Sequence, residues 1–163
     1  MNIARALRHL ASPAWLVRGT FDETALKEIE AAIAATERTH GGEVRFAVEG
    51  NLGAHELWRS VSARERALEV FAQLGVWDTD ANNGVLIYVL WADHDVEIVA
   101  DRGFNGRVTA EEWTAVCHQM EQHFRAEKPK QAVIEGVRAV GALIARHFPA
   151  SDRNELPDRP VML

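Results

Sequence analysis

A run of apolar residues at positions 85–92, the longest in the sequence, sets narrow limits on the fold. With eight residues, it is too short to cross a lipid bilayer, which takes about 20. Residues 85–91 are apolar at odd and even positions alike, which is typical of a central strand covered by helices on both faces. The run therefore predicts a layered α/β domain and no transmembrane segment.

The flanking pattern predicts a three-layer α/β/α sandwich around a small mixed sheet of about four strands. Residues 96–100 alternate in polarity and are expected to return as a hairpin beside the central strand. Val44, Phe46 and Val48 alternate with polar residues, which predicts a strand with one face in water. Helices are expected at 2–11, 20–39, 62–74, 109–124 and 133–144.

Three sequences of the form Ser/Thr-x-x-Glu indicate helix starts, because each residue of such a capping box can bond the other's backbone amide. They are Thr20 with Glu23, Ser62 with Glu65, and Thr109 with Glu112. We divide the chain into an N-terminal arm or short helix at 1–19, one domain at 20–149 and an irregular tail at 150–163.

The N-terminal arm is expected to be amphipathic, with Ile3, Leu7 and Leu10 on one face and Arg5 and Arg8 off it. Docking on its own domain is the favoured interpretation. The alternative is contact of residues 1–12 with an anionic membrane surface. No secretory signal is evident, so we expect a cytoplasmic protein.

Charge and cysteine content exclude other classes of protein. Cys117 is the only cysteine, so the chain is no disulfide scaffold, and we expect this side chain to be packed in the core. The formal charge of −6 disfavours nucleic acid as a partner. The sequence contains no P-loop, GxSxG or GxGxxG motif. His118 and His123 do not share a helical face, and we expect them at the surface.

The whole formal charge excess lies in residues 75–101, which hold six acidic residues and neither Lys nor Arg. A solvated acidic face explains such a stretch, but a bound cation would also relieve the repulsion. Within it, Asp78, Asp80 and Asn82 recur at every second position of a loop, followed by Asn83. Oxygen ligands of this kind suit a hard cation, although the spacing is not that of an EF-hand.

The expected hairpin brings a further acid to this loop. The return strand runs antiparallel to the central strand, so Asp101 and Arg102 are expected beside the loop. Asp93 and Asp95 are expected at the opposite end, as turn acids. The candidate metal ligands are therefore Asp78, Asp80, Asn82, Asn83 and Asp101. Arg102 is the candidate phosphate-binding residue beside them.

The sequence resembles the TPM domain family over residues 22–148. The resemblance rests on Asp78 followed by Asn83-Gly84-Val85-Leu86, on Ile98 with Gly103, and on Phe124-Arg125 with Gly136. It implies a Rossmann-like α/β/α sandwich with an acidic, calcium-binding depression, and an acid-phosphatase activity described for plant members. The run 77–103 is similar to a short bacterial subtype.

The sequence also departs from the family pattern. Asn82 stands where the family often has Asp, His94 where it has Arg, and Asp101 where it has the first Gly of a G-x-G. These departures weaken the case for phosphatase chemistry, although Asp101 could replace a lost ligand.

Two functions follow as hypotheses. The first is an interaction or assembly module that binds a divalent cation, calcium before magnesium or manganese, and a protein partner whose identity the sequence leaves open, possibly one associated with a membrane. The second is a metal-dependent acid phosphatase that acts on phosphomonoesters, with Arg102 offsetting charge in the transition state.

Overall fold

The computed structural model describes residues 2–12, 14–150 and 153–163. The α-helices are α1 (Ile3–Leu10), α2 (Ala14–Thr20), α3 (Glu23–Glu37), α4 (Ala54–Trp58), α5 (Ala63–Gln73), α6 (Ala110–Arg125) and α7 (Pro129–Ala145). The strands are β1 (Glu43–Glu49), β2 (Gly84–Leu90), β3 (Asp95–Ala100) and β4 (Val161–Met162). Short 3₁₀ turns, η1 (Trp91–Asp93) and η2 (Arg102–Phe104), flank β3.

The four strands form one mixed sheet in the order β3-β2-β1-β4. β1 runs parallel to both β2 and β4, whereas β2 and β3 form the antiparallel hairpin that the sequence predicts. Every residue of β2 is buried, as its two apolar faces require. The predicted fold class, an α/β sandwich with a small mixed sheet, is confirmed.

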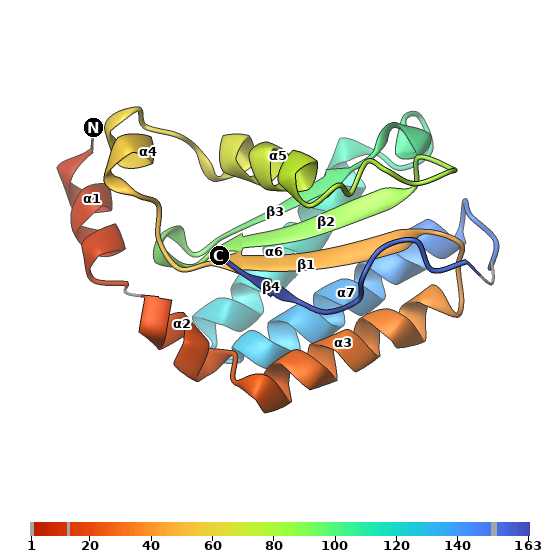
Figure 1. Ribbon diagram of the computed structural model, residues 1–163, viewed down its shortest axis with the longest axis horizontal. Coiled ribbons are helices and arrows are strands. Elements are labelled where there is room, and N and C mark those ends of the chain that lie inside the picture. The colour runs from red at the N-terminus through yellow and green to blue at the C-terminus, as the bar shows by residue number, and fades with distance from the viewer. Residues whose placement is uncertain (1, 13, 151–152) are drawn as a thin grey trace.

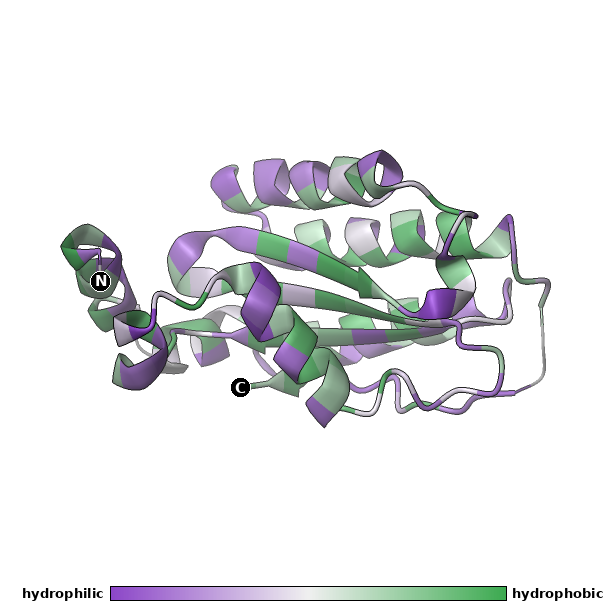
Figure 2. Cartoon of the chain, turned by 90° about the horizontal axis from the view of Figure 1, so that it is seen from above, coloured by the Kyte–Doolittle hydropathy of each residue, from purple (hydrophilic) through white to green (hydrophobic). Residues whose placement is uncertain are grey.

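Helices cover the sheet unequally (Figure 1). Helices α3, α6 and α7 lie on one face, where Phe46, Ile87 and Val137 belong to the larger hydrophobic core. Helix α5 lies on the other face, over a smaller core that contains Leu86 and Tyr88. Figure 2 colours the middle of the sheet mainly green, while the helices alternate between green and purple. The domain is thus a three-layer sandwich with one thick and one thin outer layer.

The predicted helix starts are correct in two of three cases. Complete capping boxes are present at Ser62 with Glu65 and at Thr109 with Glu112. The box predicted at Thr20 is wrong, because Thr20 ends α2 and its hydroxyl donates to the Leu16 carbonyl. Asp22 caps α3 instead, since its carboxylate accepts from the Ala25 amide at 2.8 Å.

The prediction of a wet face on β1 is also wrong. Glu43, Arg45 and Glu49 are 2%, 6% and 9% exposed, respectively. Each of these side chains contacts a partner from a distant segment of the chain. The polar positions of β1 are therefore buried and not exposed to solvent. Glu49 accepts from Arg66 and from the Tyr88 hydroxyl at 2.8 and 2.6 Å, which compensates for its burial.

The C-terminal tail, which was expected to be irregular, adds strand β4 to the sheet beside β1. Leu156 is buried in the smaller core, and its amide donates to Glu43 at 3.0 Å. Arg45 donates to the carbonyl of Pro157. The tail thus covers the charged face of β1.

Among the residues that the structure describes, no helix is both long and apolar enough to cross a bilayer.

Candidate functional site

The candidate loop joins α5 to β2 and is folded by Thr79. The Thr79 carbonyl accepts from the Asn82 amide at 3.2 Å, and the Thr79 hydroxyl accepts from the Asn83 amide at 3.1 Å. Asn82 adopts a left-handed conformation with φ of 52°, which Asn tolerates better than most residues. The loop is therefore ordered by its own hydrogen bonds before any ligand is considered.

Turn η2 holds this loop from the opposite strand, as the hairpin register predicts. The Asp101 amide donates to the Gly84 carbonyl, and the Gly103 amide donates to the Asn82 carbonyl, both at 2.9 Å. The Arg102 guanidinium donates to the Asn82 side-chain oxygen at 2.7 Å. Asp101 and Arg102 thus reach the loop at Asn82 and Gly84. The sequence predicts them beside Asp78 and Asp80, but those two residues contact other partners.

Two of the predicted ligands hold buried oxygen atoms without a hydrogen-bond partner. One is Oδ1 of Asn83, a residue that is only 2% exposed. The side-chain nitrogen of Asn83 donates to the Gly41 carbonyl. The other is Oδ2 of Asp101, whose Oδ1 accepts from the Arg102 amide at 2.7 Å. Buried polar atoms are satisfied in most native structures, so each of these two oxygens is a candidate contact for a water molecule or a ligand.

The other acids of the loop are more exposed. The Asp80 side chain is 71% exposed and forms an ion pair with Arg153. The Asp80 amide donates to Glu155 at 3.0 Å. Asp78 is exposed, and its amide donates to the Gly75 carbonyl at 2.9 Å.

A cation at this loop would have to use amide oxygens as well as carboxylates. Within the described parts of the chain, no three side chains of His, Cys, Asp or Glu are grouped so that they could hold a metal ion. Asparagine side-chain oxygens, such as that of Asn83, are also ordinary ligands of hard cations.

A small cavity of about 230 Å³ opens beside Asn83. Asp80 and Asn83 line it together with Phe148, Arg153 and Glu155. Sequence reasoning missed Arg153 and Glu155, because they belong to the tail and no local pattern links them to the loop. Their contribution depends on the course of the tail across the end of the sheet.

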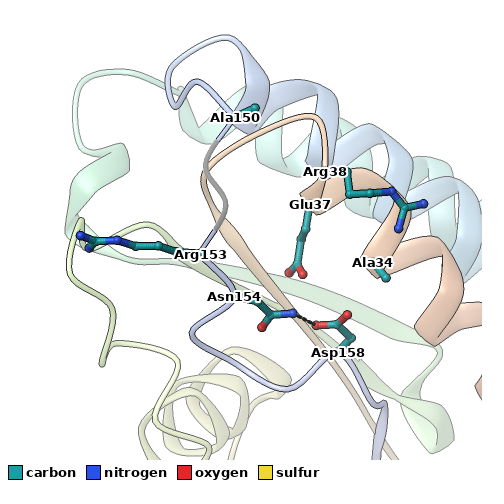
Figure 3. A pocket seen from close by; sticks show the side chains of 7 residues that line it. All are labelled: Ala34, Glu37, Arg38, Ala150, Arg153, Asn154 and Asp158. Atoms are coloured by element: carbon teal, nitrogen blue, oxygen red, sulfur yellow. Dashed lines mark hydrogen bonds between the residues drawn. The ribbon is translucent and has the colours of Figure 1, made fainter.

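A larger cavity of about 560 Å³ lies next to it, between α3 and the tail (Figure 3). The Glu37 carboxyl points into the same hollow as Asn154 and Asp158. Burial raises the pKa of Glu37 to about 8, with a further contribution from Asp158, against the lowering effect of a 2.8 Å hydrogen bond from the Val44 amide. No pattern in the sequence predicts this second acidic hollow.

The opposite end of the hairpin differs from the prediction. Asp93 accepts from Arg5 at 2.8 Å and from Arg8 at 3.1 Å, and it lies 3.2 Å from the His9 imidazole. Burial alone would raise the Asp93 pKa, but these hydrogen bonds lower it. Asp93 is therefore the anchor of the N-terminal arm. Asp95 has its pKa raised to about 6, by burial first and then by neighbouring carboxylates.

The remaining predictions about single residues are confirmed. Cys117 is 9% exposed within the larger core, and burial raises the pKa of its thiol to about 12. His118 is exposed, and His123 forms a 2.6 Å contact with Glu135 at the surface.

Comparison with known proteins identifies the family and the fold. The family described as "TPM domain" matches residues 17–143. No curated protein matches the chain.

Solved structures match more extensively. The NMR structure of the BA42 protein from the psychrophilic bacterium Bizionia argentinensis is 28% identical with a TM-score of 0.76, covering 87% of this chain and 94% of its own. The N-terminal domain of a P. gingivalis protein has a TM-score of 0.66 at 18% identity, over 83% of this chain and 84% of that one. The N-terminal domain of cg2496 from Corynebacterium glutamicum has a TM-score of 0.56 at 12% identity, over 89% and 81%. The last two are similar in fold alone.

Proposed function

The chain belongs to the TPM domain family, and from that premise we propose that it is an interaction or assembly module that binds a divalent cation at the loop before β2. The ligands would come from Asp78, Asp80, Asn82, Asn83 and Asp101. Calcium is the first choice of metal, with magnesium and manganese as alternatives, because all the proposed ligand atoms are oxygen.

The observation that supports this proposal is the pair of buried, unpartnered oxygens on Asn83 and Asp101. A cation within reach of either atom would give that atom a partner. It would also reduce the repulsion within residues 75–101, which carry the whole formal charge excess. The cation would in addition fix turn η2 against the loop, and so prepare an ordered surface for a protein partner.

Asp80 would have to exchange its partner for the cation to be fully coordinated. Its present partner, Arg153, is 68% exposed at the side chain, and exposed ion pairs contribute little to stability. The exchange would therefore cost little.

A metal-dependent acid phosphatase is the second candidate, and the position of Arg102 favours it. Arg102 is exposed and donates to Asn82, so a phosphate bound to the cation would meet a guanidinium group. In this alternative Asp78, Asp80 and Asp101 would hold the metal. Asn82 and Asn83 would position water or the phosphate, and Arg102 would offset charge in the transition state.

Thermal unfolding of the purified protein tests the cation site. We expect calcium to raise the melting temperature, because a ligand at one hundred times its Kd adds about 2.7 kcal/mol to native stability. For a domain of this size that corresponds to roughly 5–10 °C. The shift should disappear in Asp101→Asn and persist in Asp95→Asn, which removes a charge at the other end of the hairpin.

The absence of a shift with calcium, magnesium or manganese would refute the cation site. If a shift is found, the metal-loaded protein is assayed with p-nitrophenyl phosphate between pH 5 and 8. Hydrolysis that is lost in Asp101→Asn and weakened in Arg102→Ala would replace the module with the phosphatase.

A further inference from the structure

Helix α1 is fixed to the domain by its polar side. Arg5 pairs with Asp93 at 2.7 Å and donates to the Val61 carbonyl at 2.7 Å. His9 is 1% exposed and accepts from the Leu52 amide at 2.9 Å. These contacts hold the helix at two segments on either side of α4, and they fix which of its faces turns away from the domain.

The face that turns away is apolar. Ile3, Leu7 and Leu10 are 69%, 61% and 77% exposed. Their spacing of four and three residues places them in one row along the helix. The sequence prediction that the arm docks on its own domain is correct, but the apolar row takes no part in the docking. The row lies ready for a partner outside the domain.

The exposed apolar surface continues into neighbouring helices. Trp15 in α2 is 70% exposed, and Leu16 beside it is also exposed. Helix α4, which lies next to α1 in Figure 1, exposes Trp58 to 72%. Exposed apolar groups gathered at one end of a molecule indicate an interaction site. Tryptophan in particular favours the boundary between lipid and water.

The charge of this end selects among possible occupants. Residues 1–20 contain three arginines and no acidic residue, in a chain whose formal charge is −6. Asp93 balances only one of Arg5 and Arg8, and Arg18 is exposed. A second copy docked on the same face would bring positive charge to positive charge. An anionic bilayer offers both an apolar layer and negative charge.

We propose that α1 and α2 form an interfacial anchor that binds the surface of an anionic lipid bilayer. Ile3, Leu7, Leu10 and Trp15 enter the boundary between headgroups and acyl chains, and Arg18 lies among the lipid phosphates. The eight residues of α1 span about 12 Å, so the helix lies in the plane of the surface and does not cross it. Because its polar side stays bonded to Asp93, the anchor holds the domain in one orientation.

Vesicle co-sedimentation of the full chain tests this anchor. We expect binding to vesicles of phosphatidylcholine with phosphatidylglycerol, weaker binding to phosphatidylcholine alone, and loss of binding at high salt. The triple variant Ile3→Ser, Leu7→Ser, Leu10→Ser should reduce the bound fraction at least about tenfold. Leu68→Ser, which removes an exposed leucine from α5, serves as the matched control and should bind like the wild type.

Each contrary outcome is distinct. Wild-type protein that ignores both vesicles, or a triple variant that binds as well as the wild type, would overturn the anchor. A concentration-dependent dimer that the triple variant abolishes, without vesicle binding, would assign the face to a second copy. All arms are run in chelator, where the anchor is expected to bind, so the result does not depend on the proposed cation site. Near-identical circular dichroism of variant and wild type establishes that the fold is retained, since the three side chains are exposed.

Discussion

Three charged residues on β1 illustrate how a buried charge is tolerated at the scale of single residues. Glu49 receives two hydrogen bonds from Arg66 and one from Tyr88. The hydrogen bonds that Arg66 donates to Glu49 raise the pKa of Arg66 despite partial burial, and so help to keep the pair ionised. Removing one member of such a network leaves the other charge buried and uncompensated, so the loss of either Glu49 or Arg66 would be destabilising.

Glu37 gives a prediction about pH. Its pKa is about 8 in the folded protein and 4.5 when unperturbed. The folded state therefore keeps a proton that the unfolded state releases, and the resulting stability is lost as the pH rises from about 4.5 to 8. The variant Glu37→Gln keeps the acceptor for the Val44 amide but cannot ionise. Across this pH interval we expect its free energy of unfolding to fall by about 1–2 kcal/mol less than that of the wild type, after allowance for screening by solvent.

The measurement is urea unfolding at pH 5 and pH 8. Glu111→Gln, at an exposed position in the first turn of α6, is the control and should follow the wild-type profile. If Glu37→Gln lost as much stability as the wild type between the two pH values, the buried carboxyl would be ionised throughout.

At the scale of elements, η2 and the loop before β2 lie in close contact at Gly103. A β-carbon on Gly103 would collide with the backbone oxygens of Asn82 and Ala81, which have no rotamer by which to move aside. We expect Gly103→Ala to push η2 away from the loop and to lower the unfolding free energy by about 1–3 kcal/mol. Calcium affinity should fall with it, because Asp101 lies at the start of the displaced turn.

Gly19→Ala provides the comparison for Gly103→Ala. Gly19 lies in α2, where a β-carbon would meet no other atom, so this variant should be as stable as the wild type or slightly more so. Denaturant unfolding of both variants decides the matter. Equal stability of the two would mean that the loop and η2 move apart freely.

Elements with local signals could be predicted from the sequence. The capping boxes at Ser62 and Thr109 and the apolar run of β2 each depend on residues close together in the chain. The start of α3 was missed because Asp22 competes with Thr20 for the cap and is the better placed acceptor. Helices α2 and α4 have seven and five residues, too few for a periodic pattern.

At the scale of the whole molecule, the tail ties distant parts of the domain together. Leu156 precedes β4 in the chain and is 8% exposed, with its side chain in the smaller core. Its backbone amide donates to Glu43. We expect Leu156→Ala to cost about 2–3 kcal/mol, whereas Leu163→Ala, at a residue 41% exposed, should change the stability by less than about 0.5 kcal/mol. Urea unfolding measures both. A Leu156→Ala protein as stable as the wild type would show that the tail covers the sheet without stabilising it.

The candidate site divides in the same way between local and distant contributions. The approach of Asp101 and Arg102 to the loop could be predicted, because an antiparallel hairpin brings the end of β3 back beside the start of β2. The contacts of Asp80 with Arg153 and Glu155 could not, since only the path of the tail brings these residues together. The partners of Glu43 and Arg45 were missed for the same reason, and the alternation along β1 therefore suggested a wet face.

The late arrival of β4 has a consequence during synthesis on the ribosome. Val161 pairs with Ala47, so one edge of β1 stays unpaired until residue 161 has been synthesised. An open edge strand is a template for association with other nascent chains. Glu43, Arg45 and Glu49 lie along that edge strand, and charges pointing from an unfinished sheet discourage such pairing. We therefore expect the same three side chains, which partners neutralise in the finished protein, to disfavour such pairing while the sheet is incomplete.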